Sequence, residues 1–131
     1  KWPENVRALV EAFADTGIDI QLSYRVAGNT LNLDAHTAQE LQYVIKEALS
    51  NAARHAQATR VQVNISKKGD NLDIAVIDNG VGFEIEELGD DLLSGNGLRN
   101  MQERVENLGG EFAIVSKIAQ GTEVLIKLPL K

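Results

Sequence analysis

The spacing of apolar residues switches repeatedly between helical and strand periodicity, and this order restricts the possible folds most. The order is helix, strand, helix, strand, strand, helix, strand, strand. It predicts an α+β two-layer sandwich, in which three helices cover one face of a mixed, mostly antiparallel five-stranded sheet. The predicted helices are 3–15, about 35–56 and about 97–108, and the predicted strands are 18–26, 61–65, 72–77, 111–116 and 122–128.

Length and composition limit the classes of function. The 131 residues suit one domain over 1–131. The chain has no Cys, which excludes disulfides, and with only His36 and His55 a zinc site is not expected. Thirteen Lys and Arg against nineteen Asp and Glu give a net charge of −6, which argues against nucleic-acid binding. No apolar run approaches about 20 residues and no signal-peptide core is visible, so we expect a soluble cytosolic domain.

The predicted helix 35–56 has a polar stripe beside its apolar face, with Asp34 as the expected N-cap. A carboxylate and an amide oxygen suit Mg²⁺, and the neighbouring nitrogen donors suit phosphate oxygens. The alternative is a set of ordinary polar residues at the boundary of a buried face. The stripe consists of Glu47, Asn51, Arg54 and His55, and the apolar face of Leu41, Val44, Ile45, Ala48, Leu49 and Ala52.

Two glycine-containing segments form the rest of the predicted site. Asp78 ends a predicted strand, where its carboxylate could accept a hydrogen bond from an exocyclic amine such as that of adenine. Gly80 and Gly82 follow it and allow a ligand ring to approach the backbone. The alternative is a simple turn, because Asp and Gly are common in turns.

The second segment, Gly95-Asn96-Gly97-Leu98, opens a predicted helix, where free backbone N–H groups favour phosphate. Its alternative is a loop hinge, and it is neither a Walker P-loop nor a Rossmann motif. The three segments could bind different parts of one ligand: the base at Asp78, the metal at Asn51 and the phosphates at Gly97. An acidic loop at 84–96 is able to close between the last two segments.

Over essentially its whole length the sequence resembles the catalytic and ATP-binding domain of two-component sensor histidine kinases. Residues 47–56 resemble the N box of that family, and residues 78–83 its first glycine box. Residues 95–105, followed by Leu108-Gly109-Gly110, are similar to the second glycine box of the nitrate-sensor, LiaS-like and DesK-like subfamily. Residues 121–124 match the terminal G-T-x-V strand of that group.

The resemblance implies the Bergerat ATP-binding fold, shared with Hsp90, DNA gyrase and MutL, with ATP and Mg²⁺ as cofactors. It implies that Asn51 binds Mg²⁺ and that Glu47 acts as a base or polarising group during transfer of the γ-phosphoryl to histidine. It also implies that Asp78 accepts a hydrogen bond from the adenine amine, with Thr122 supporting a water there. The other implied ATP-binding residues are Arg54, His55, Gly80, Gly82, Gly95, Gly97 and Leu98, and segment 84–96 corresponds to the ATP lid.

The resemblance also implies partners outside this sequence. In the family the phosphoacceptor histidine lies on a preceding two-helix dimerisation domain, which passes the phosphoryl group to a response regulator. His36 lies at a helix start and His55 in the N box, so neither qualifies as acceptor. We therefore expect a monomeric cytoplasmic domain whose sensor region lies upstream, in a parent protein of the bacterial cell membrane.

One departure and three alternatives remain at this point. Many relatives have glycine where Ala119 stands, so the turn before Gly121 is expected to differ locally. The alternatives are a conformational ATPase of the chaperone or topoisomerase type, an anti-sigma-factor serine kinase, and an interaction module with a decayed pocket. The first has longer lids and larger chains, residues 97–110 favour the sensor kinase over the first two, and intact Asn51 and Asp78 argue against the third.

Overall fold

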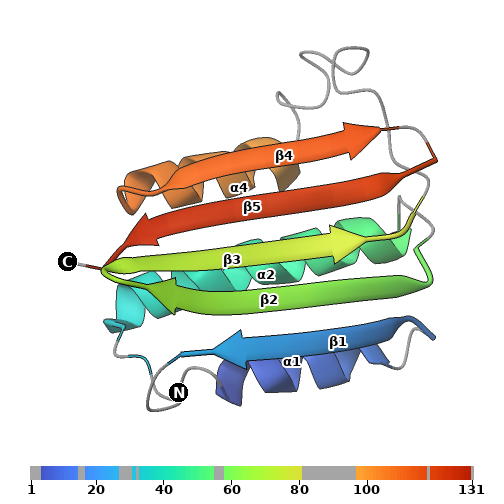
Figure 1. Cartoon of the computed structure of the whole chain (residues 1–131), viewed down its shortest axis with the longest axis horizontal. Coiled ribbons are helices and arrows are strands. Elements are labelled where there is room, and N and C mark those ends of the chain that lie inside the picture. Colours follow the sequence, from blue (N-terminus) through green and yellow to red (C-terminus); the bar gives the residue numbers. More distant parts are fainter. Residues whose placement is uncertain are drawn as a thin grey trace.

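The computed structural model describes residues 4–14, 17–26, 31, 33–54, 58–80, 97–117 and 119–130. These residues form an open five-stranded sheet with three helices on one face, which confirms the predicted fold class (Figure 1). In chain order the elements are α1 (Glu4–Ala14), β1 (Asp19–Arg25), α2 (Ala35–Arg54), β2 (Arg60–Lys68), β3 (Asn71–Asp78), α4 (Gly97–Asn107), β4 (Glu111–Lys117) and β5 (Gly121–Pro129).

The strand order is β1-β2-β3-β5-β4, and only the pair β1–β2 is parallel. This pair is joined through α2, because parallel neighbours need a long crossover connection. Strands β2 and β3 form a hairpin whose pairing continues to Lys68 and Asn71, at the turn that contains Gly69. For that reason β2 is longer than the predicted strand 61–65.

The core lies between the sheet and the helices. Every apolar residue predicted for the inner face of α2 is buried. The strands alternate, so that one side of β2 and β3 faces this core and the other faces away from the helices. The most buried side chains include Leu41, Ile45 and Leu49 of α2, Val61, Val63 and Ile65 of β2, Leu72 and Ile74 of β3, and Met101 and Val105 of α4.

The ends of two helices are fixed by local hydrogen bonds. Asp34 is the predicted N-cap of α2: its Oδ1 accepts the Thr37 backbone N–H at 2.7 Å, and this bond lowers the pKa of Asp34. After the C-terminal end of α4, Gly109 has a φ of +86°, and the Gly110 N–H donates to the Val105 carbonyl at 3.0 Å. This Schellman motif ends α4 and directs the chain into β4.

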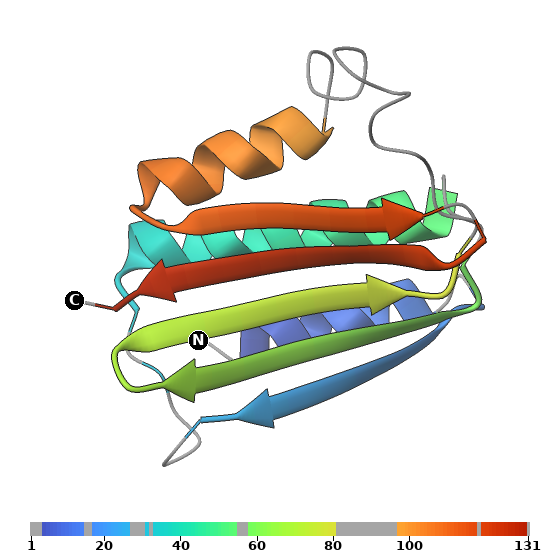
Figure 2. The same cartoon turned by 45° about the horizontal axis from the view of Figure 1, so that its top comes forward.

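Several chain ends meet at one end of the sheet (Figures 1 and 2). There α2 and β3 end and β5 begins, while α4 begins on the same side but short of this end. Helices α2 and α4 run in opposite directions, so the last turn of α2 and the first turn of α4 lie toward the same end. The end of α2, the end of β3 and the start of α4 are therefore directed toward the same end of the molecule.

Candidate functional site

Asp78 is half-buried at the end of β3, where backbone groups hold its carboxyl. Its Oδ1 accepts the Gly80 backbone N–H at 2.8 Å, and the Thr122 backbone N–H also hydrogen-bonds to this carboxyl. Burial raises the pKa of Asp78 above its ordinary value of 3.8, and the two N–H groups oppose this shift. A carboxyl oriented in this way can accept a further hydrogen bond from an amine.

A buried polar row extends from Asp78 across two more strands. Asp78 pairs with Thr122 on β5, and Thr122 pairs with Ser116 on β4. The Ser116 hydroxyl donates to the Gly121 carbonyl at 3.2 Å and lies 2.9 Å from Thr122 Oγ1. Because Ser116 has one hydroxyl hydrogen, Thr122 is the donor in the second bond, and its oxygen keeps lone pairs for a water or a ligand.

Gly121 brings the backbones of β3 and β5 close together beside Asp78. A Cβ at residue 121 would collide with the Asp78 carbonyl oxygen, and the φ of Gly121 is +87°. Both facts require glycine, since other residues rarely adopt this φ. Ser116 and Gly121 were not among the predicted site residues, although Gly121 belongs to the quoted terminal motif.

Glu47 and Asn51 lie one helical turn apart on α2, and both are half-buried. No hydrogen bond or ion pair joins either side chain to another residue within the described part of the chain. Both side chains therefore lie on one face of α2, as predicted, and their role in binding a ligand stays a prediction. Arg54 is the last residue of α2, while His55 lies outside the described residues.

Gly97 is the first residue of α4, as predicted, and Leu98 follows it. The first turn of a helix has backbone N–H groups without intrahelical partners, and these groups favour an anion. Gly82, Gly95 and the predicted lid 84–96 lie outside the described residues.

Asn79 is a residue of the site region that the sequence alone did not single out. Its Oδ1 accepts the backbone N–H groups of Thr59 and Arg60 at 3.0 and 2.9 Å, and its Nδ2 donates to Thr59 Oγ1 at 3.0 Å. The Asn79 N–H also donates to the Arg60 carbonyl at 3.2 Å. Asn79 therefore ties the connection between α2 and β2 to the end of β3. The N-G pair after the strand was its only local signal.

A second unpredicted contact joins α2 to α4. Arg104 Nη1 donates to both carboxylate oxygens of Glu40, at 2.8 and 2.9 Å. The guanidinium carbon of Arg104 also lies 3.8 Å from the centroid of the Tyr43 ring. We refer to Glu40, Tyr43 and Arg104 as the α2–α4 polar contact.

Among the described residues there is no cluster of three or more His, Asp or Glu side chains that could hold a metal ion. Glu47 and Asn51 offer two oxygen donors, which fits a Mg²⁺ ion that also takes oxygens from phosphate and water. In the same part of the chain, no helix has the length and hydrophobicity that crossing a membrane requires.

Residues 36–131 match the family described as histidine kinase-, DNA gyrase B-, and HSP90-like ATPase. The chain is 36% identical over 131 residues to the sensor histidine kinase YdfH of Bacillus subtilis, covering 98% of this chain and 31% of YdfH. It is 40% identical over 87 residues to the sensor protein VraS of Staphylococcus aureus, covering 66% of this chain and 24% of VraS. The chain thus spans less than a third of the length of these relatives.

Solved structures show the same arrangement. The histidine kinase domain from the Erythrobacter litoralis EL346 blue-light activated histidine kinase superposes with a TM-score of 0.77 at 26% identity, covering 96% of this chain and 59% of that chain. The Acinetobacter baumannii histidine kinase AdeS gives a TM-score of 0.74 at 19% identity, over 98% of this chain and 64% of that chain, which supports the fold alone.

Proposed function

Because the chain belongs to the histidine kinase-, DNA gyrase B-, and HSP90-like ATPase family, we propose that it is the ATP-binding catalytic domain of a sensor histidine kinase. The main support is the half-buried Asp78 carboxyl, held by the Gly80 and Thr122 N–H groups. It lies at the end of β3, at the end of the sheet where α2 also ends (Figure 1). The family resemblance noted in the sequence is confirmed by the match and by the relatives.

In this proposal the adenine amine donates to Asp78, and the Thr122 oxygen accepts from a water that also contacts the base. Gly80 and Gly82 leave room for the ring. The phosphates lie toward the first turn of α4, where the backbone N–H groups of Gly97 and Leu98 bind them, and Gly95 is assigned to the same phosphates by its motif. Arg54, the last residue of α2, and His55, which follows it in the sequence, supply positive hydrogen-bond donors to the same phosphates.

Asn51 would hold Mg²⁺ through its amide oxygen, with Glu47 one turn away. When bound, the ion would neutralise charge on the phosphates. Glu47 orients the imidazole of the incoming histidine and accepts its proton. The bond from the γ-phosphorus to the bridging oxygen breaks, ADP leaves with that electron pair, and a phosphorus–nitrogen bond forms on the histidine. Rate acceleration then comes mainly from positioning and from charge stabilisation.

The acceptor histidine and the response regulator belong to the same proposal. We propose that residues 1–131 act as one domain on a histidine of a separate dimerisation domain, within a parent protein of the bacterial membrane. The relatives are sensor histidine kinases, which supports this assignment. The isolated domain is expected to be a monomer of 14.3 kDa by light scattering, and a mass near twice that value would contradict it.

Titration calorimetry with ATP and Mg²⁺ tests the proposal directly. We expect saturable binding at one site, weakened about 10- to 100-fold in Asp78→Asn, because an amide nitrogen then faces the adenine amine. Asp73→Asn is the matched control, since Asp73 lies on the same strand but is oriented to the face away from the helices. Absence of binding to the unmodified chain would overturn the proposal.

The metal and transfer roles need the complete kinase. Asn51→Ala is expected to abolish autophosphorylation with ATP and Mg²⁺, whereas Gln39→Ala on the exposed side of α2 should leave it unchanged. Normal turnover in the Asn51 variant would remove the metal-binding role from that residue.

A further inference from the structure

The α2–α4 polar contact lies far along both helices from the proposed phosphate site. Arg104 is seven residues after Gly97, about 10 Å along α4. Glu40 is likewise seven residues before Glu47, about 10 Å along α2. Since the helices are antiparallel (Figures 1 and 2), the same step from the contact along each helix reaches Gly97 and Glu47. Asn51 lies one further turn along α2.

The apolar contacts between these helices are less directional than the contact of Arg104. Met101 and Val105 are fully buried beneath α4, but apolar packing is non-directional and methionine adapts to irregular space. Arg104, by contrast, has defined geometry on two sides: hydrogen bonds to both Glu40 oxygens and stacking on Tyr43. The Glu40 side chain is 19% exposed, so solvent shields this ion pair only in part.

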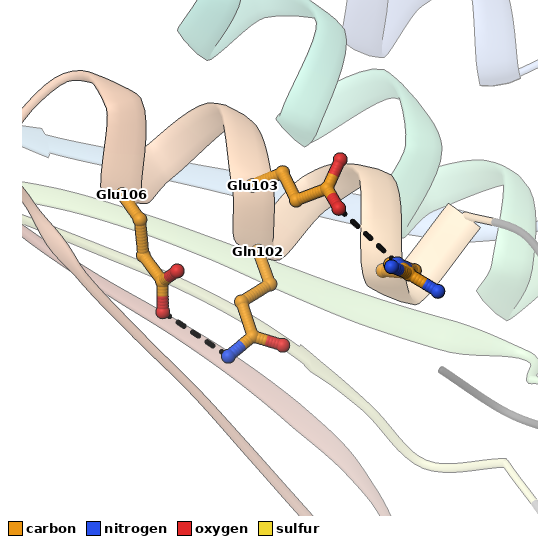
Figure 3. Close-up of polar contacts among 4 residues, drawn as sticks. Gln102, Glu103 and Glu106 are labelled. Carbon is orange, nitrogen blue, oxygen red and sulfur yellow. Dashed lines mark hydrogen bonds and ion pairs between the residues drawn. The ribbon is translucent and has the colours of Figure 1, made fainter. Parts of the chain in front are cut away.

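Two other polar pairs of α4 do not set its position against α2. Arg99 contacts Glu103 at 3.1 Å and Gln102 contacts Glu106 at 3.1 Å, and all four residues belong to α4 itself (Figure 3). In the Arg99–Glu103 pair both side chains are more than half exposed. Such pairs support the helix but do not connect it to α2.

We propose that Arg104 is a positioning residue, which sets the axial register of α4 against α2 through Glu40 and Tyr43. In this way it places the first turn of α4 opposite Glu47 and Asn51. A slip of one residue would move that turn by about 1.5 Å and rotate it by about 100°. The inference rests on the proposed function, because it concerns the phosphate end of the same nucleotide site.

Titration calorimetry with two nucleotides separates this role from simple stabilisation. MgATP engages both the base end and the first turn of α4, whereas AMP has the adenine end and one phosphate only. The test variant is Glu40→Gln and its matched control is Glu103→Gln, which makes the same change in an ion pair confined to α4. Thermal unfolding of each ligand-free variant shows the temperature range in which it stays folded.

We expect Glu40→Gln to bind ATP about tenfold more weakly, with AMP affinity within about twofold of the unmodified chain. Glu103→Gln should change neither affinity. As a second test, Arg104→Lys keeps the charge but not the planar group on Tyr43, so it should lose less ATP affinity than Arg104→Met.

Three results would overturn the inference. ATP affinity could be unchanged in Glu40→Gln and Arg104→Met although their unfolding temperatures fall, which would indicate a purely structural contact. ATP and AMP affinities could fall equally, which would place the effect at the base end. Finally, failure of the unmodified chain to bind either nucleotide would overturn the proposed function and this inference with it.

Discussion

The base end and the phosphate end of the proposed site are held by different kinds of interaction. At the base end, Asp78 is fixed by backbone N–H groups from Gly80 and Thr122 and by the pairing of β3 with β5. At the phosphate end, α4 is held against α2 by side chains, with Arg104 and Glu40 supplying the directional contact. The base end is therefore fixed mainly by the backbone, whereas the phosphate end depends on particular side chains.

Gly121→Ala is the largest expected disruption of the base end. The new Cβ would meet the Asp78 carbonyl, and the positive φ adds strain, so we expect the free energy of unfolding to fall by about 3 kcal/mol. Gly17→Ala is the matched control: its φ is +88°, but no atom lies within 4 Å of the added Cβ. Urea denaturation should show a loss of only about 1 kcal/mol for that variant. Equal losses would mean that the strands move apart at little cost.

The pH dependence of Asp78 should act on binding and stability in opposite directions. Only the ionised carboxyl accepts freely from adenine, so ATP affinity should fall up to about tenfold per pH unit below its raised pKa. The ligand-free fold behaves oppositely. Between 3.8 and the raised pKa the folded state binds more protons than the unfolded state, so this contribution to stability is lost as pH rises.

Both quantities can be measured as differences between the unmodified chain and Asp78→Asn, using calorimetry for ATP and urea unfolding for stability. Taking the difference cancels the contributions of other carboxyl groups to the pH dependence, such as that of Asp34, whose pKa is lowered. An ATP affinity with the same pH profile in both proteins would argue that Asp78 does not bind the base.

Asn79→Ala tests the link between the two ends. The substitution removes the acceptor for the Thr59 and Arg60 N–H groups, and we expect a loss of about 1–2 kcal/mol in the free energy of unfolding. Amide hydrogen exchange should increase at residues 58–60, which follow α2. Asn79→Asp keeps the acceptor oxygens and should lose less. If exchange at 58–60 stayed slow in Asn79→Ala, the connection would be held by the strand pairing alone.

Local patterns predicted much of this molecule. The spacing of apolar residues predicted the buried face of α2, and Asp34 and Gly97 predicted the starts of two helices. Asp78 ends β3 as predicted, because a carboxylate followed by glycines at a strand end is a local feature. Glu47 and Asn51 share one face of α2, since helical geometry fixes which residues do so, and the binding roles of all three residues stay predictions.

The remaining contacts depend on segments that are distant in the sequence. Glu40 and Arg104 are 64 residues apart, and nothing near either residue indicates the other. The bond between Ser116 and Thr122 requires β4 and β5 to pair, and the Thr122 N–H reaches Asp78 only because β5 lies beside β3. Such contacts follow from strand order and helix packing, which periodicity alone does not determine.

Ala119→Gly has the smallest expected effect and concerns the turn that leads into Gly121. Ala119 has a φ of +69°, the left-handed region that costs a non-glycine residue about 1–2 kcal/mol. Glycine relieves this cost but adds freedom to the unfolded chain, so we expect a net gain of about 0.5–1 kcal/mol in urea denaturation. Because Ala119 is exposed and the base end is fixed by Gly121 and Asp78, ATP affinity should not change. A change in ATP affinity with Ala119→Gly would show that the turn, and not only the strand pairing, determines where Thr122 lies relative to Asp78.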